Sequence, residues 1–305
     1  MLQAPPDVCV LVADWGIGDH YIVAGLAEAV RERYGLRVWM AGKARLSFLS
    51  GLFPKAERYL DWPTTIKPST ITTPVIRGGA FYYAHFPGLE LMRAVGYGGF
   101  HFIDAYRCRL GLTPQATLST ALRPSMADVA RATDALRACG FDPATTILVS
   151  TTTTTTPTSG IEESFWLDLR SELVSAGLRV VLNAALGSQP PPGWESMQIA
   201  LPDVRATAMA CVGVCSLRSG LSDLLCDLPV PHVVVYPQAP YWSGLLQKGT
   251  TFARYNLAHP PWEFVVTPSS ARLLAKEIAV LFQNRRPDAD RRMYEQTRGG
   301  MGPDC

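Results

Sequence analysis

The chain has 305 residues, of which 48% are hydrophobic and 18% are charged, so it is a globular protein with a large core and not a disordered one. Its formal net charge of +2 gives no reason to expect a nucleic acid or a membrane surface as a partner. The length favours two domains, because hydrophobic cores stop growing at roughly 250–300 residues.

No run of about 18 apolar residues occurs, and the first seven residues lack the basic and apolar segments of a secretory signal. The number of cysteines, seven, is odd, and several of them lie in apolar runs. No second Cys or His pair stands near Cys211 and Cys215, so no metal site is expected there. We therefore expect reduced, buried thiols, no transmembrane segment and a cytoplasmic location.

The first half of the chain predicts a parallel sheet with helices on its faces. An apolar run at residues 8–13 predicts a buried strand, residues 16–18 a turn, and residues 21–34 a helix that Gly35 ends. A second strand follows at residues 37–40, and this short β-α-β order is typical of parallel strands. The further expected elements are a helix at 46–52, strands at 58–60 and 80–85, and helices at 88–95, 99–110 and 126–139.

The second half repeats this alternation after a turn at residues 141–143, which is the expected linker. Strands are expected at 146–150, 178–182, 212–217 and 232–236, and helices at 162–176, 204–210, 219–226 and 269–283. We therefore predict an α/β protein with two Rossmann-like domains, residues 1–143 and 144–305, that face a cleft.

The first candidate site follows the first strand. Gly16 and Gly18 allow the backbone to approach a ligand, although Tyr21 stands where a dinucleotide fingerprint has its third glycine. Asp19 lies at the carboxyl edge of the strand, where open sheets bind ligands, and is either a helix cap or a general base toward a hydroxyl. His20 and His85 are the histidines expected to face the cleft.

The second candidate site is the segment Leu-Arg-Ser-Gly-Leu-Ser-Asp at residues 217–223, which predicts a strand end, a tight turn and a helix start. A helix start carries unpaired N–H groups and partial positive charge, and Arg218 beside it indicates a phosphate or diphosphate. We expect Ser219 to be the N-cap and, with Gly220, to bind the phosphates. Asp223 either favours the helix dipole or orients Arg218, so direct phosphate contact by Arg218 and pairing with Asp223 both stay open.

A run of threonines at residues 151–156 follows the first strand of the second half. The hydroxyls of Thr151, Thr152 and Thr153 can donate hydrogen bonds to phosphate or sugar oxygens, although a repetitive loop without a ligand is the alternative. Asn183 ends the next predicted strand and is also expected at the cleft.

These residues, in this order, resemble glycosyltransferases of the GT-B architecture, and in particular the heptosyltransferase-like group. The resemblance rests on Gly18 and Asp19 after the first strand, on the threonine loop, and on residues 217–223, which are similar to an Arg-Ser-Gly-Leu-x-Asp motif of bacterial polysaccharide-type transferases. The chain departs from heptosyltransferases at residues 159–163, Ser-Gly-Ile-Glu-Glu, where those enzymes carry a lysine near the donor phosphates. Either Arg218 replaces that lysine or the donor differs, and the heptose substrate is not carried over.

The resemblance implies direct displacement that moves a sugar from a nucleotide-diphosphate sugar to an acceptor hydroxyl, with inversion and without a metal or other cofactor. Asp19 is then the base, and the turn at residues 218–220, with the threonines, holds the departing diphosphate. The donor is expected in the second domain. The acceptor, a glycan, a lipid-linked sugar or another hydroxyl compound, is expected in the first, with closure around residues 140–146.

Two other functions stay open at this point. A non-catalytic protein that binds nucleotide sugars on the same fold would need no base at Asp19. A nicotinamide-dependent oxidoreductase is disfavoured by the incomplete glycine fingerprint and by Ala41, Gly42 and Lys43 after the second strand, where an acidic residue would be needed.

Overall fold

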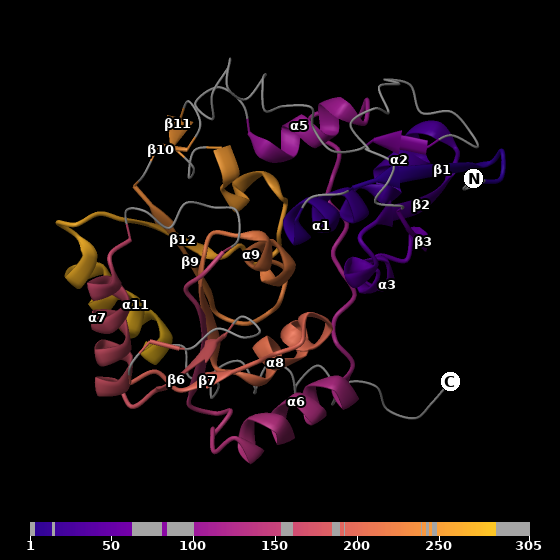
Figure 1. Cartoon of the computed structure of the whole chain (residues 1–305). Coiled ribbons are helices and arrows are strands. Elements are labelled where there is room, and N and C mark those ends of the chain that lie inside the picture. The colour runs from indigo at the N-terminus through magenta and orange to yellow at the C-terminus, as the bar shows by residue number, and fades with distance from the viewer. Residues whose placement is uncertain are drawn as a thin grey trace, which may run out of the picture.

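The computed structural model describes residues 4–13, 16–62, 101–153, 161–184, 190, 191, 193–238 and 249–284, and only the backbone of residues 81–83, 240, 241, 244 and 245. Two parallel sheets, each accompanied by helices, form two units that lie side by side (Figure 1).

The first sheet has four parallel strands in the order β3-β2-β1-β4. Its central strand has the sequence Val-Cys-Val-Leu-Val and is buried along its whole length, as expected for a parallel strand covered on both faces. The strands are β1 (Val8–Val12), β2 (Arg37–Gly42), β3 (Ala56–Asp61) and β4 (Phe81–Tyr83). The helices of this unit are α1 (Ile17–Gly25), α2 (Ala27–Tyr34), α3 (Phe48–Leu52) and α5 (Phe102–Arg109).

The second sheet has six parallel strands in the order β12-β9-β8-β5-β6-β7. They are β5 (Thr146–Ser150), β6 (Arg179–Asn183), β7 (Ser196–Met197), β8 (Gly213–Leu217), β9 (His232–Pro237) and β12 (Trp262–Val266). A short antiparallel hairpin, β10 (Pro240–Tyr241) and β11 (Gly244–Leu245), lies outside this sheet. The chain order reverses beside β1 in the first sheet and beside β5 in the second, and ligands of open sheets bind at such switch points.

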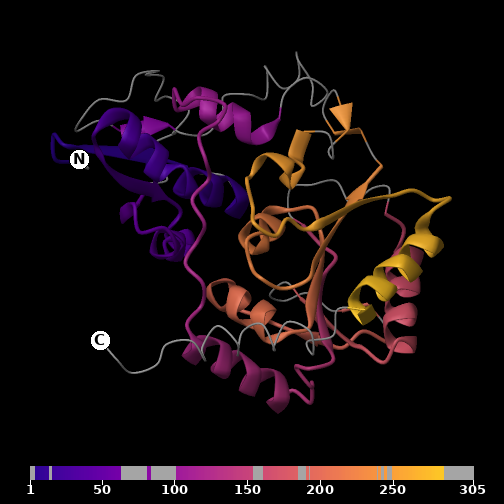
Figure 2. The same ribbon diagram turned by 180° about the vertical axis from the view of Figure 1, so that it is seen from behind.

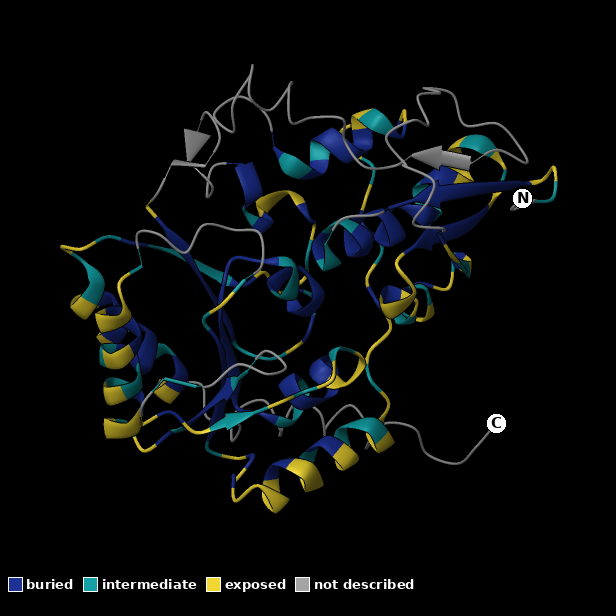
Figure 3. Ribbon diagram, in the orientation of Figure 1, coloured by how far each residue is buried: buried dark blue, intermediate teal, exposed yellow. Residues whose placement is uncertain are grey.

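Helices cover both faces of the second sheet. Ile147 and Val149 of β5 pack toward α7 (Glu163–Ser175) and α11 (Ala271–Asn284), whereas Leu148 between them packs toward α8 (Val204–Ala210) and α9 (Gly220–Leu225). The outer sides of α7 and α11 are exposed (Figure 3).

The α9 face meets the first unit directly. A single cluster of buried apolar side chains contains Leu11 and Tyr21 of the first unit together with Leu224 and Tyr255 of the second. The segment that leads from the first unit to the second also binds the second unit, since the N–H of Ala121 donates to Asp227 at 2.9 Å. Figures 1 and 2 both show α1 beside α9.

Several sequence predictions need correction. The helix predicted at residues 21–34 begins earlier, at Ile17, and is divided at Leu26 into α1 and α2. The strands β7 and β12 at the two edges of the second sheet were not predicted. The domain boundary after residue 143 stays a prediction, and α6 (Met126–Ala138), which precedes it, packs on α8 of the second unit. The predicted helix at residues 88–95 lies outside the described residues.

Candidate active site

The helices α1 and α9, one from each unit, start next to each other. A Cβ placed on Gly18 would lie 3.1 Å from the Cα of Gly220, and one placed on Gly220 would lie 2.7 Å from the backbone nitrogen of Gly18. The absence of side chains therefore allows the two helices to make backbone contact. Gly18 thus admits the backbone of α9, and its predicted approach to a ligand stays a prediction.

Asp19 lies in the first turn of α1 and is partly exposed. Its Oδ2 accepts the backbone N–H of Gly16, the N-cap residue, at 2.8 Å. Its Oδ1 accepts the phenolic O–H of Tyr106, which comes from α5. Capping by Asp19 is thus present, and it does not exclude a second role, because a carboxylate offers about four lone-pair sites.

Arg218 directly follows β8 and is only 4% exposed. Its Nη1 and Nη2 each lie 2.9 Å from an oxygen of Asp223, and its Nε donates to the carbonyl of Thr250 at 2.9 Å. Of the two roles left open by the sequence, the structure shows the pairing with Asp223. All three guanidinium nitrogens have protein partners, and direct contact of Arg218 with a phosphate stays a prediction.

Burial and charge act in opposite directions on this pair. Burial disfavours the charged guanidinium, but the carboxylate of Asp223 outweighs it and raises the pKa of Arg218 above its ordinary value. Burial also raises the pKa of Asp223, against the lowering effects of Arg218 and of the Tyr255 hydroxyl, which donates to Oδ1 at 2.9 Å. The pair is therefore a buried, hydrogen-bonded unit that shapes the turn before α9.

Ser219 occupies the predicted N-cap position of α9, but its side chain makes no cap hydrogen bond. The hydroxyl of Ser222 instead accepts the N–H of Ser219 at 2.9 Å and donates to the Ser219 carbonyl at 2.6 Å. The Ser219 Oγ is buried and faces the backbone N–H of Ser222 in a capping box, outside the geometry of a full hydrogen bond.

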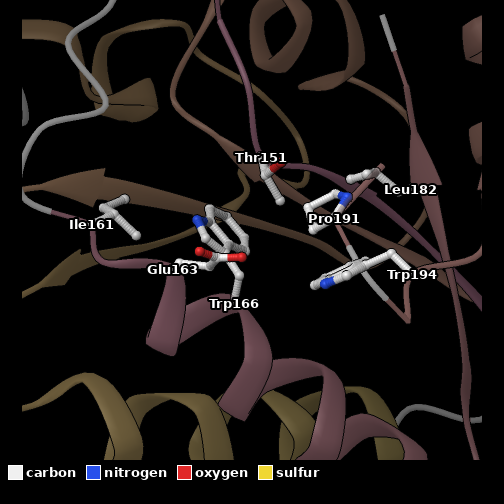
Figure 4. Close-up of a pocket in the computed structure, with 7 residues that line it drawn as sticks. All are labelled: Thr151, Ile161, Glu163, Trp166, Leu182, Pro191 and Trp194. Carbon is white, nitrogen blue, oxygen red and sulfur yellow. The ribbon is translucent and has the colours of Figure 1, made fainter. Parts of the chain in front are cut away.

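The threonine loop and β6 border a different region. A cavity of about 220 Å³ is lined by Thr151, Ile161, Glu163, Trp166, Leu182, Pro191 and Trp194 (Figure 4). Trp166, Leu182 and Trp194 belong to the core that packs against α7 and α11, so the cavity lies on the face of the sheet away from α9.

The predicted site is therefore not gathered at one place. Thr151 borders the cavity, whereas Asp19 and Ser219 lie at the contact of α1 with α9 on the other face of the sheet. Thr152 is exposed and Thr153 is partly buried, and Asn183 ends β6 next to the cavity wall.

His20 does not lie between the units. It is fully buried, its Nδ1 lies 2.9 Å from the carbonyl of Gly16, and its ring stacks on Tyr59 with centroids 6.4 Å apart. This follows from helical geometry, because successive residues are turned by about 100° and Asp19 and His20 cannot face the same way. His85 lies outside the described residues.

Sequence reasoning missed two tyrosines that contact the candidate site. Tyr106 binds Asp19 across 87 residues and Tyr255 binds Asp223 across 32. No motif marks either residue, because each contact depends on how distant elements pack. The aromatic content of the helix predicted at 99–110 was the one available signal.

Within the described ranges, no group of three His, Cys, Asp or Glu side chains is placed to hold a metal ion. None of the helices in those ranges has the length and apolar character needed to cross a membrane. The six cysteines found there are free thiols, and Cys108 and Cys139 are exposed, in contrast to the expected burial.

No protein-family model matches the chain, and no curated protein matches it significantly in sequence. Solved structures do match. The iron-containing dodecameric glycosyltransferase TibC from enterotoxigenic E. coli H10407 is 16% identical, with a TM-score of 0.55 over 86% of this chain and 64% of TibC. A glycosyl transferase family 9 protein from Veillonella parvula DSM 2008 is 11% identical, with a TM-score of 0.58 over 93% of this chain and 98% of that one. The E. coli ADP-heptose LPS heptosyltransferase II is 14% identical, with a TM-score of 0.57 over 91% and 99%.

At these identities the likeness is one of fold. The chain shares with these glycosyltransferases an α/β architecture with parallel sheets in two Rossmann-like units, which confirms the predicted fold class. The chain spans about two thirds of the length of TibC and almost the whole length of the other two.

Proposed function

We propose that this protein is a glycosyltransferase that moves a sugar from a nucleotide-diphosphate sugar to an acceptor hydroxyl. One observation carries the proposal. The contact of α1 with α9 brings together the oriented carboxylate of Asp19 from one unit and the buried hydroxyl of Ser219, at the start of α9, from the other. A carboxylate suits a general base, and a buried hydroxyl suits a phosphate oxygen.

The fold supports this choice of chemistry. TibC has been solved in complex with ADP-D-beta-D-heptose, and the E. coli heptosyltransferase WaaC with ADP. Those ligands belong to those proteins. For this chain we propose only the class, a nucleotide-diphosphate sugar, with a glycan, a lipid-linked sugar or another hydroxyl compound as acceptor.

In the proposed reaction, Asp19 accepts the proton of the acceptor hydroxyl as its oxygen attacks the anomeric carbon. The bond from that carbon to the diphosphate oxygen breaks, the nucleoside diphosphate leaves, and the configuration inverts. Ser219 and Gly220 are proposed to hold the departing diphosphate. The threonines at residues 151–153 are left out of this proposed grip, because Thr151 borders the cavity on the other face of the sheet. Arg218 contributes through Asp223, by holding the turn in shape.

We further propose that transfer needs no metal ion and takes place in the cytoplasm. TibC is described as containing iron, so the metal independence needs its own test. We expect turnover to be undiminished by a chelator. Loss of turnover in the chelator, with full recovery on adding back one metal ion, would contradict metal independence.

A non-catalytic nucleotide-sugar binder remains the second candidate, and one observation favours it. Both oxygens of Asp19 already accept a hydrogen bond, which a purely structural carboxylate would also show.

A ligand screen on the full chain tests the proposal. Thermal unfolding is measured with nucleoside diphosphates, nucleotide sugars and NAD(P), followed by assay of nucleoside diphosphate release from each sugar donor that binds. Stabilisation by one nucleotide sugar and its diphosphate, with release, is the expected result. Stabilisation without release by any donor, over a panel of acceptors, would favour the binding protein, and stabilisation by NAD(P) alone would contradict both.

A further inference from the structure

Tyr106 joins α5 to the carboxylate of Asp19. Its side chain is fully buried, and its ring packs edge to face on Phe102 with centroids 5.1 Å apart. Its hydroxyl donates to Oδ1 of Asp19, while the Gly16 N–H occupies Oδ2. The two bonds approach different oxygens, so together they fix the rotation of the carboxylate.

Tyr106 acts in this contact as a donor. Burial, and next the charge of Asp19, raise the pKa of Tyr106 well above its ordinary value. The phenol therefore keeps its proton and stays a donor to the carboxylate. The proton that Asp19 takes up as a base must then come from the acceptor hydroxyl.

The helix that carries Tyr106 is held in place by the other unit. The Nε2 of His101 lies 2.8 Å from the carbonyl of Thr251, and Nη2 of Arg107 donates to the carbonyl of Arg254 at 3.0 Å. Asp104 of the same helix forms an ion pair with Arg254. A donor on a helix anchored in this way is pre-organised, and its orientation does not depend on loop order.

We propose that Tyr106 is the positioning residue of Asp19, which keeps the carboxylate in one orientation toward the acceptor hydroxyl. This inference rests on the proposed function, because it assigns Tyr106 a part in the same reaction. Misplacement of a reacting group by a small distance can cost on the order of 100-fold in rate, so the hydroxyl of Tyr106 is expected to matter for turnover more than for substrate binding.

The test compares Tyr106→Phe with Tyr34→Phe. Tyr34 is a matched control, since its hydroxyl also makes a long-range hydrogen bond in the same unit, to the carbonyl of Leu110 at the C-terminal end of α5, at 2.9 Å, and not to the carboxylate of Asp19. Both variants keep their rings. Two readouts are used: kcat and KM across pH with the donor found in the screen, and the titration of the Asp19 Cγ resonance by ¹³C NMR, assigned with Asp19→Asn.

Tyr106→Phe is expected to lower kcat about 10- to 100-fold with little change in KM. Because a hydrogen bond to a carboxylate favours its charged form, the acidic limb of the pH profile and the Asp19 resonance should both move to higher pH. Tyr34→Phe should change neither. An active wild type whose kcat, pH profile and Asp19 titration are unaltered by Tyr106→Phe would overturn the inference alone. A wild type that releases no diphosphate from any donor would overturn the proposed function, and the inference would fall with it.

Discussion

Arg218 and Asp223 form a buried charged pair at the start of α9. Their side chains are 5% and 3% exposed, and the guanidinium also lies over the ring of Phe252, 4.9 Å from its centroid. Two desolvated charges persist only if each satisfies the other, so Asp223 is needed to keep Arg218 buried. The sequence left Asp223 as a dipole partner or as the residue that orients Arg218, and the structure shows the second, with Tyr255 and Thr250 packed around the pair.

Replacing Asp223 with Asn should lower the free energy of unfolding by about 3–5 kcal/mol, because it leaves the charge of Arg218 buried without a counter-charge. Urea denaturation measures the change. The control is Asp134→Asn, which removes the partner of Arg137 in a pair whose side chains are 79% and 66% exposed. It should cost at most about 1 kcal/mol. Equal effects of the two substitutions would contradict the importance given to the buried pair.

His101 makes the stability depend on pH. The N–H of Ile103 donates to its Nδ1 at 3.3 Å, and its Nε2 faces the Thr251 carbonyl at 2.8 Å, a pattern that requires the neutral ring. Burial lowers the pKa of His101 from 6.5 to about 4, against the backbone hydrogen bond to Thr251. The folded state then binds fewer protons than the unfolded state between these values, so stability must fall as the pH falls through that window.

Between pH 6.5 and about 4, the free energy of unfolding should therefore decrease by roughly 1.4 kcal/mol per pH unit at the steepest from this group. His101→Asn keeps a capping side chain but has no titrating ring, so its stability should fall less steeply over the same window. Urea titrations at several pH values give both slopes. Parallel curves for the wild type and the variant would show that His101 is not the titrating group.

At the scale of elements, the contact of α1 with α9 is the feature that places the candidate site. The sequence predicted both strand–turn–helix units and put Asp19 at the start of the first. It interpreted Gly18 through ligand binding, because a glycine that admits a helix and one that admits a phosphate look alike in a sequence. The structure shows the contact with the second unit, since a Cβ on Gly18 would clash with Oδ2 of Asp223 and with the backbone of Gly220.

Gly18→Ala should therefore force α1 and α9 apart and lower the free energy of unfolding by about 1–3 kcal/mol, the cost of overpacking a close contact. Gly51→Ala is the matched control, because Gly51 lies in α3 and nothing is within 4 Å of where its Cβ would stand. That change should leave stability unaltered or raise it by up to about 1 kcal/mol, through helix propensity. Thermal and urea unfolding measure the stability of the two variants. A Gly18→Ala variant as stable as the wild type would argue against close contact between α1 and α9.

At the scale of the whole molecule, local patterns predicted most of the two sheets. The buried apolar runs of β1, β5, β8 and β9 are long enough to identify without a structure. The short edge strand β7 has only two residues, and β12 is half-buried, so neither carries a strong pattern.

The site was less predictable than the fold. Asp19 and Ser219 could be singled out because each follows a strand at a helix start, but Tyr106 and Tyr255 contact the site from distant elements. Thr151 follows β5 on the face of the second sheet that carries α7 and α11, whereas α1, which carries Asp19, contacts α9 on the other face. Which face a residue takes is set by the register and packing of the whole sheet.

The most direct test of the proposed function is Asp19→Asn in the full chain, compared with Asp134→Asn and the wild type. Asn has the shape of Asp and can still accept the Gly16 N–H, but it cannot take up a proton. Donor affinity and nucleoside diphosphate release are measured on the same samples, with the donor identified by the screen. We expect donor affinity within a few-fold of the wild type and turnover lowered by about 10²–10⁴-fold in Asp19→Asn alone. Wild-type turnover in that variant would show that Asp19 only caps α1 and would contradict the mechanism.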